Sequence, residues 1–371
     1  MIKVGINGFG RIGRIAFRIG LLKHANEIEF AAINTSGSMD VSGWAHLVNY
    51  DTMYRKFEKE VKAEEVKKAT EVTDKDPLIG YLKVEGKKIP VLAQRDPSKI
   101  PWKDYGADIV IESTGKFTTE DDAKKHALGG AKRVIISAPS KGGNVGTYVL
   151  GVNEYKGEAE VLSNASCTTN CVAPVAAVLH SKFGIEKAIM TTVHGYTDEQ
   201  RLQDNSHEDL RRARAAAENI VPTTTGAAVA TTETIPELKD LFDGKALRVP
   251  VLTGSITDFT ALLKKEVTTE EVNNAFVEAS QNALYKGILA ITDKPLVSSD
   301  IVGRSESAIV DLSLTQVVGG NLVKVFAWYD NEWGYAERLV EQVIRVGKTL
   351  ETSKAPTDPI SLSFETGSKN G

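Results

Sequence analysis

Cysteine is scarce in this sequence of 371 residues, which contains only two, Cys167 and Cys171. Two cysteines so close in the chain cannot form the disulfide framework of a small secreted protein. Long apolar runs are missing as well, and none approaches the roughly 18 residues that a membrane-spanning helix needs. The first residues lead into a strand without a basic or apolar leader. We therefore expect a cytoplasmic protein that does not enter the membrane.

A surplus of positive charge is also missing, because the formal net charge is -4. Such a chain has no general attraction for nucleic acid, although a local basic cluster can still bind an anion. The content of 42% hydrophobic and 25% charged residues is that of a globular protein, and the length suggests about two domains. We expect small molecules as partners, with no specific nucleic acid and no metal.

The first thirty residues have the pattern of two strands around a helix. Residues 2–6 and 29–33 are predicted strands, and 14–22 carry a helical apolar period. A glycine-rich turn with G-x-G-x-x-G spacing lies between them, formed by Gly8, Gly10 and Gly13. These glycines permit a tight turn, close approach to a pyrophosphate and close helix packing. A merely tight turn is the alternative, but the βαβ context favours a dinucleotide site.

Later segments continue one sheet and then begin another. Residues 108–112 and 132–137 are predicted as further strands of a doubly wound sheet. Longer loops then separate apolar strands predicted at 188–193, 249–263, 309–314 and 322–329. We interpret these as an antiparallel second domain.

Two polar segments are not expected to carry function. The run of lysines and acids over 55–76 is interpreted as a solvated helix or excursion on the surface. From Lys348 onward the sequence turns polar, and its last twenty or so residues are expected to lack fixed structure.

Cys167 lies in the segment Ser163–Cys171, just before an apolar helical pattern over 173–183. The N-terminus of a helix presents free N–H groups and positive dipole charge, which we expect to lower the pKa of Cys167. The alternative is a small buried hydrophobic residue. The sequence context favours a nucleophile.

Several segments together resemble phosphorylating glyceraldehyde-3-phosphate dehydrogenase, and the resemblance covers residues 1 to about 347. The matching segments are Gly5–Arg14, Ser163–Cys171, Thr192–Thr197, Asp209–Ala217, Pro222–Ala228 and Trp328–Tyr335. The resemblance implies an α/β Rossmann dinucleotide-binding domain (1–166, joined by a C-terminal helix at about 333–349). It also implies an α+β catalytic domain (167–332) with a mainly antiparallel sheet, a tail at 350–371 and a homotetramer.

The same resemblance implies a mechanism. Cys167 attacks the aldehyde carbon of glyceraldehyde 3-phosphate, His194 accepts the thiol proton, and inorganic phosphate cleaves the resulting thioester. The residues implied to bind the two phosphates are Ser166, Thr168, Thr197, Arg212, Thr225, Gly226 and Arg248. The basic run 210–214 is alternatively a solvated helical face or an oligomer salt-bridge patch. The other five histidines are interpreted as structural.

The cofactor is expected to be NADP or NAD, with NADP favoured. The residues implied to bind it are Gly8, Gly10, Arg11, Ile12, Gly13, Asn34, Thr35, Ser36, Arg95, Ser113, Thr114, Gly115, Ser137, Ser206 and Asn331. NAD-preferring relatives carry an aspartate at the position of Thr35, which repels a 2′-phosphate, whereas Thr35 and Ser36 offer hydroxyls. Asn205-Ser206 replaces a Leu-Pro pair of NAD-specific relatives, and Arg95 adds a cation. Neutral drift at a tolerant site is the alternative.

Two other functions compete with this interpretation. Erythrose-4-phosphate dehydrogenase uses the same cysteine and histidine but disrupts the phosphate-site motif, which is intact here over 223–226. A non-catalytic binding protein, such as one that binds RNA in its dinucleotide cleft, would not need to keep Cys167, His194 and Arg248 together.

Overall fold

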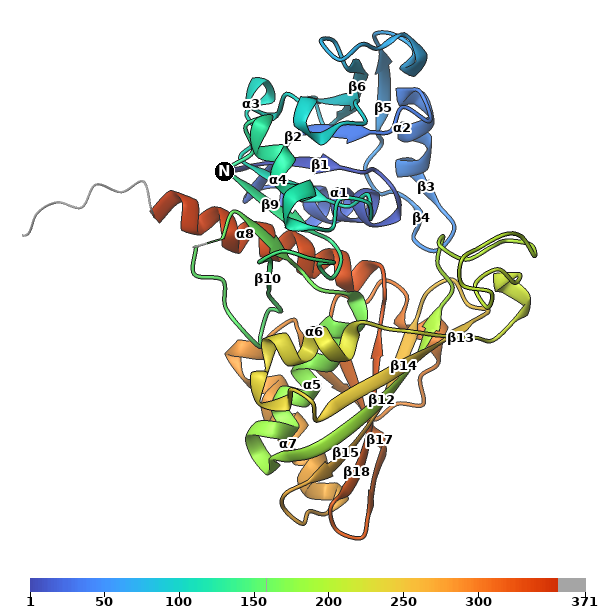
Figure 1. Ribbon diagram of the computed structural model, residues 1–371, viewed down its shortest axis with the longest axis vertical. Coiled ribbons are helices and arrows are strands. Elements are labelled where there is room, and N and C mark those ends of the chain that lie inside the picture. The colour runs from blue at the N-terminus through green and yellow to red at the C-terminus, as the bar shows by residue number, and fades with distance from the viewer. Residues whose placement is uncertain (158, 353–371) are drawn as a thin grey trace, which may run out of the picture.

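The computed structural model describes residues 1–157 and 159–352. Two sheets lie one above the other in Figure 1, and the long helix α8 (Trp333–Thr352) runs between them. In the described part of the chain, no helix combines the length and the apolar character required to cross a bilayer.

The first sheet has nine strands in the described chain, in the order β10-β11-β9-β8-β1-β2-β7-β6-β5. Neighbouring strands are parallel from β10 to β7, and β6 and β5 extend that edge in antiparallel pairing. Its strands are β1 (Ile2–Asn7), β2 (Ile28–Thr35), β5 (Lys62–Glu65), β6 (Leu78–Val84), β7 (Lys87–Ala93), β8 (Ile109–Glu112), β9 (Arg133–Ile136), β10 (Gly146–Thr147) and β11 (Val161–Ser163).

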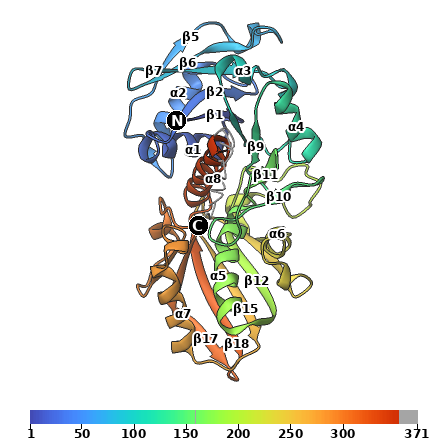
Figure 2. The same cartoon turned by 90° about the vertical axis from the view of Figure 1, so that its left-hand side faces the viewer.

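Helices cover both faces of this sheet, which is why its central strands are mostly apolar and buried. All four residues of β8 are buried. The helices α1 (Arg11–Lys23) and α8 pack with β1 in one core, whereas α3 (Trp102–Tyr105) and α4 (Glu120–Leu128) contribute to the core of the opposite face. Figure 2 shows α1 and α4 on opposite sides.

The second sheet is mixed and mostly antiparallel, with the order β13-β14-β12-β15-β18-β17-β16 in the described chain. Only the pairs β12–β14 and β16–β17 are parallel there. Its strands are β12 (Ile185–Gly195), β13 (Val221–Thr223), β14 (Phe242–Val249), β15 (Ser255–Leu263), β16 (Leu289–Thr292), β17 (Ala308–Val318) and β18 (Leu322–Tyr329).

Burial alternates strictly along β15, so only one face of that strand meets the core. The helices α5 (Cys167–Phe183) and α7 (Thr269–Gln281) supply the apolar side chains on that core. The remaining elements are the helices α2 (Val41–Asn49) and α6 (Ala227–Thr234), the ribbon β3 (Tyr50–Asp51) with β4 (Arg55–Lys56), and the short turns η1 (Ala69–Glu71), η2 (Pro97–Lys99), η3 (Ala216–Glu218), η4 (Pro236–Leu238), η5 (Ala283–Tyr285) and η6 (Ser298–Ile301).

The predicted fold class is confirmed, but the bounds of some predicted elements are wrong. Helix α1 begins at Arg11 rather than at residue 14. The strand predicted over 249–263 is divided between β14 and β15, because Pro250 follows β14 and Gly254 turns with φ +90° against Ser298.

Of the two polar segments, the first takes the excursion form of the two that were expected, and the second is helical over its first residues. Residues 55–76 are an excursion that contains β4, β5 and η1, and no α-helix. Helix α8 continues to Thr352, so residues 350–352 of the predicted tail are helical. The rest of the predicted tail, 353–371, lies outside the described residues.

Candidate active site

Cys167 is the first residue of α5, as its sequence context predicts. Ser166 is the N-cap, and its Oγ accepts a hydrogen bond from the backbone N–H of Thr169 at 3.0 Å. Ala165 adopts a left-handed conformation with φ +55°, which costs free energy in a residue with a side chain. Its carbonyl accepts a hydrogen bond from the hydroxyl of Tyr335 at 3.0 Å. The chain is thus bent and held just before the cysteine.

His194, near the end of β12, brings Nε2 to 3.3 Å from Sγ of Cys167. Nδ1 lies 2.6 Å from the carbonyl oxygen of Gly195. When Nδ1 donates its proton to that carbonyl, Nε2 carries a free lone pair toward the sulfur. The ring of Tyr329 packs edge-on against the imidazole, with ring centroids 6.0 Å apart. The structure therefore brings the two predicted catalytic residues together with a base oriented toward a thiol.

Burial governs the protonation of this pair. It raises the pKa of Cys167 above the usual thiol range, although the charge of Arg248 and hydrogen bonds from Thr168 act in the opposite direction. The expectation of a lowered pKa is therefore wrong for the free enzyme, because desolvation outweighs the helix end. Burial, followed by the charge of Arg248, lowers the pKa of His194 to about 3. The resting pair is a thiol beside a neutral imidazole.

Arg248 lies beside His194 and shares one acid with Arg212. Nη1 of Arg248 lies 2.8 Å from Nδ1 of His194 and 3.2 Å from the carbonyl oxygen of Gly195. Glu199 binds Nη2 of Arg248 through Oε1 at 3.2 Å, and Nη1 of Arg212 through Oε2, also at 3.2 Å. Arg212 also donates from Nε to Oγ1 of Thr223 at 2.9 Å. The sequence alone did not mark Glu199, an acid in a long loop without a motif role.

Two buried polar atoms at this place have no protein partner in the described chain. They are Nε of Arg248 and Oγ1 of Thr197. Buried donors without partners are costly, and both belong to residues that the sequence assigned to the substrate phosphate. Arg248 lies beside His194, so its free Nε suits an anion there.

The residues predicted for the second phosphate divide into two groups. Thr168 is buried and its Oγ1 lies 2.9 Å from the hydroxyl of Tyr329, so its side chain makes a structural contact in the core. Ser166 is the N-cap of α5. Thr225 and Gly226 precede α6, whose N-cap is Gly226. The backbone N–H of Ala227, the first residue of α6, donates to Oγ1 of Thr225 at 3.2 Å, and a helix N-terminus of this kind suits an anion.

The glycine turn is built for a dinucleotide. A Cβ on Gly8, which has φ +94°, would lie 2.6 Å from the backbone nitrogen of Thr114, so the loop needs glycine there. The N-cap Gly10 has nothing within 4 Å of a Cβ position. Helix α1 has neither a side-chain cap nor an acid in its first turn, which includes Ile12 and Gly13, and a Cβ on Gly13 would collide with the carbonyl oxygen of Gly8. This end fits a pyrophosphate.

The guanidinium of Arg11 is already engaged within the protein. It donates to Glu332 from Nε at 2.8 Å and Nη2 at 2.5 Å, and to Asp51 from Nη1 at 2.5 Å. Its side chain thus joins α1 to the end of β3 and to the residue directly before α8. Only the place of Arg11 in the first turn of α1 remains for the cofactor.

The other predicted cofactor residues lie at the carboxyl ends of the central strands. Ser113 donates from Oγ to the carbonyl of Gly8 at 2.7 Å. The backbone N–H of Thr114 donates to Oε1 of Glu112 at 2.8 Å, and Ser137 donates its N–H to the carbonyl of Glu112 at 2.9 Å. Gly115 follows this turn and is exposed. They form the edge at which ligands bind in such sheets.

The end of β2 carries the residues expected to select the cofactor. Asn34 is buried and donates to Oδ1 of Asn7 at 2.7 Å. Thr35 is also buried and donates its hydroxyl to the carbonyl of Leu92 at 3.0 Å. The hydroxyl proton of Thr35 is thus used within the fold. Arg95 donates from Nε to the carbonyl of the exposed Ser36 at 3.2 Å.

The last two predicted cofactor residues, Asn331 and Ser206, come from the segment predicted as the catalytic domain. Asn331 accepts hydrogen bonds from Ser255 at 2.8 Å and Thr253 at 3.2 Å through Oδ1, and no donor bond from its Nδ2 occurs within the described residues. Ser206 is exposed on the loop between β12 and β13, which projects to the right in Figure 1. Its carbonyl accepts from Nε of Arg201 at 2.9 Å.

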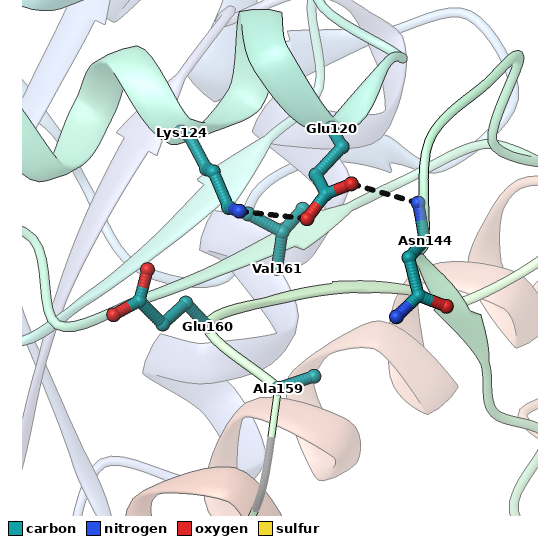
Figure 3. Close-up of a pocket in the computed structure, with 6 residues that line it drawn as sticks. All are labelled: Glu120, Lys124, Asn144, Ala159, Glu160 and Val161. Carbon is teal, nitrogen blue, oxygen red and sulfur yellow. Dashed lines mark hydrogen bonds and ion pairs between the residues drawn. The ribbon is translucent and has the colours of Figure 1, made fainter.

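A polar hollow of about 310 Å³ near α4 contains none of these residues. Figure 3 shows its lining, where Glu120 is paired with Lys124 and with the backbone of Asn144. It lies apart from the predicted site in the sequence and carries no predicted role.

Comparison with known proteins agrees with the geometry. Residues 2–120 match the family described as "Glyceraldehyde 3-phosphate dehydrogenase, NAD binding domain", and residues 166–331 match its "C-terminal domain". A glyceraldehyde-3-phosphate dehydrogenase of Streptomyces coelicolor is 53% identical over 352 residues, or 94% of this chain and 99% of the relative. Glyceraldehyde-3-phosphate dehydrogenase 2 of Bacillus subtilis is 48% identical over 95% of this chain and 99% of its own length. The Geobacillus stearothermophilus enzyme is 49% identical over 92% and 96%, respectively. The chain belongs to the glyceraldehyde-3-phosphate dehydrogenase family.

Proposed function

We propose that this protein catalyses the reversible oxidative phosphorylation of D-glyceraldehyde 3-phosphate to 1,3-bisphosphoglycerate. The observation that carries the proposal is the 3.3 Å contact between Sγ of Cys167 and Nε2 of His194, beside the unpartnered Nε of Arg248. A nucleophile, a base and an anion site thus lie together.

The first step is proton transfer. Because the free thiol holds its proton, Nε2 of His194 takes it as Sγ attacks the aldehyde carbon. The C–S bond forms, and the carbonyl oxygen becomes an oxyanion that the protonated imidazole can stabilise. Arg248 and Thr197 hold the substrate phosphate through their free polar atoms, which orients the aldehyde toward the sulfur.

The second half returns the thiol. Loss of hydride from the same carbon leaves a thioester on Cys167, and a bound nicotinamide cofactor supplies the hydride acceptor. An oxygen of inorganic phosphate then attacks the thioester carbon, the C–S bond breaks, and the sulfur leaves as a thiolate that recovers a proton from His194. Arg212 and the N-terminus of α6 bind that phosphate.

For the cofactor we propose NADP, with NAD also accepted. The uncapped first turn of α1 fits the pyrophosphate, and Asn331 offers its free Nδ2 to the nicotinamide carboxamide. The hydroxyl of Thr35 already donates a hydrogen bond within the fold. Thr35 therefore favours NADP only because it places no negative charge near the 2′-phosphate. Arg95, which donates a hydrogen bond to the carbonyl of Ser36, is the cation that suits a 2′-phosphate.

The organisation of the protein follows the same proposal. A boundary between 166 and 167 lies at the N-cap of α5, with α8 returning to the first domain. We propose a homotetramer in the cytoplasm, in which the projecting loop with Ser206 reaches the adenosine end of a neighbouring site.

One assay tests the proposal. Turnover of glyceraldehyde 3-phosphate is measured with NAD and with NADP, in the presence and absence of inorganic phosphate. We expect phosphate-dependent reduction of both cofactors, with the larger kcat/KM for NADP. Reduction without phosphate, and preference for erythrose 4-phosphate, would favour the alternative dehydrogenase. No reduction with either sugar would overturn the enzyme assignment.

A further inference from the structure

Within the excursion over residues 55–76, the part from residue 66 onward packs against the segment that follows β2. The backbone N–H of Ala69, in η1, donates to Oδ1 of Asp40 at 2.7 Å. A Cβ on Gly37, directly after Ser36, would lie 3.7 Å from the carbonyl oxygen and 3.8 Å from the Cβ of Ala69. The excursion is therefore in contact with the end of β2, where a Rossmann sheet binds the adenosine ribose.

A pocket of about 350 Å³ opens between these segments. Its lining comes from the end of β2, the end of β7 and the excursion. The residues that line it are Ser36, Gly37, Ala69, Thr70, Val72, Thr73, Asp74, Ala93, Gln94 and Arg95. Half of the lining is thus supplied by the excursion.

Two charged residues of this lining differ in their pairing. Arg95 makes no ion pair within the described residues and donates only to the carbonyl of Ser36. The carboxylate of Asp74 is paired with Nζ of Lys99 at 2.6 Å and accepts from Nε2 of Gln94 at 3.1 Å. The hydrogen bond from Lys99 lowers the pKa of Asp74, so the acid is charged at neutral pH. The pocket therefore has a free cation and a neutralised acid.

We infer that the excursion forms the outer wall of the adenosine site, and that Asp74 with Lys99 sets the preference between a free 2′-hydroxyl and a 2′-phosphate. This inference rests on the proposed function. Asp74 supplies a carboxylate near the ribose that Thr35 does not, and it opposes a 2′-phosphate. Lys99 weakens that opposition and lets Arg95 bind the phosphate.

The test uses two substitutions with opposite expected signs. Asp74→Asn removes the acid and frees Lys99, so the NADP-to-NAD ratio of kcat/KM should rise by roughly two- to fivefold. Lys99→Met leaves the acid unneutralised, and the ratio should fall by a similar factor. A purely structural role would not move the ratio in opposite directions.

Asp76→Asn is the matched control. Asp76 lies in the same excursion and is paired with Lys67, but it does not line the pocket. The same change of charge there should leave the ratio unchanged. An equal shift of the ratio in Asp76→Asn would show that general surface charge causes the effect, and it would overturn the inference.

Ligand binding separates this inference from the proposed reaction. Calorimetry with adenosine 2′,5′-bisphosphate and with 5′-AMP measures the same preference without turnover. If the wild-type protein binds both ligands and the two variants shift their relative affinities, the inference stands even without dehydrogenase activity. If the wild-type protein is an active dehydrogenase and neither variant shifts the ratio, the inference is wrong and the proposed function remains.

Discussion

Nε2 of His24 lies 3.0 Å from Oε1 of Glu337, joining the C-terminal end of α1 to α8. Nδ1 of His24 also contacts Glu27 at 3.0 Å, and Lys23 binds Glu337 at 2.8 Å. Glu341 adds negative charge near the imidazole. These groups together make the contact between the two helices sensitive to pH.

We expect His24 to stabilise the fold only while it is protonated. The hydrogen bond with Glu337 raises the pKa of His24 above 6.5, so its contribution is complete below pH 6.5 and is lost as pH rises through the folded pKa. Burial alone would raise the pKa of Glu337, but hydrogen bonds from His24 and Lys23 lower it to about 2. The contribution of Glu337 is therefore complete above pH 4.5 and is lost as pH falls toward 2.

Chemical denaturation of the wild type and His24→Gln between pH 5 and pH 9 measures the first effect. The difference in unfolding free energy should be largest at the acidic end and should shrink as pH rises. His46→Gln, at an exposed histidine, is the control and should give no such trend. A difference that grows with pH would contradict the assignment.

Cys167→Ala should abolish turnover and leave cofactor affinity within about twofold, because the thiol forms the bond to substrate and does not hold the dinucleotide. Steady-state kinetics and cofactor titration measure the two quantities. Cys171→Ala removes the other, buried thiol and should keep kcat. Residual turnover in the first variant near the wild-type rate would exclude Cys167 as the nucleophile.

His194→Asn should lower kcat by about 10²- to 10⁴-fold, the usual contribution of a positioned base. Alkylation of Cys167 by iodoacetamide should slow as well, since the thiol loses its proton acceptor. The exposed His46→Asn serves for comparison. Unchanged alkylation together with unchanged kcat would show that Nε2 does not take the thiol proton.

Glu199→Gln should tighten the binding of inorganic phosphate by roughly two- to fivefold. The carboxylate of Glu199 occupies donors of both Arg212 and Arg248, and a neutral amide competes with an anion less strongly. Glu208→Gln makes the same change in the same exposed loop, at a residue with no ion pair in the described chain. The KM for phosphate measures the effect, and weaker binding in Glu199→Gln would contradict it.

Motifs with a local mechanism were the predictable part of the site. The glycine turn and the N-terminal cysteine depend on residues a few positions apart, so Gly8 and Cys167 lie where the sequence places them. Pairings between distant residues were not predictable, because single-residue patterns carry no partner. The ion pair between Arg11 and Glu332 joins residues 321 positions apart.

Buried polar networks show the same limit. His126 was interpreted as structural, and it is buried, with Nε2 2.9 Å from Oε2 of Glu112. Trp102 donates to its Nδ1 at 3.0 Å. Nothing in the sequence near any of these three residues indicates the other two. The fold class could be predicted from periodicity, whereas these contacts are seen only in the folded structure.

Because of helix α8, the core of the first domain cannot be completed until late in synthesis of the chain. Side chains of α8 such as Leu339 and Val343 complete the core under β1, which begins at Ile2. That core therefore stays open until more than 340 residues have been made. Closing it joins the two ends of the chain, a slow contact for folding. A nascent chain stalled before α8 would expose apolar surface to chaperones and to aggregation.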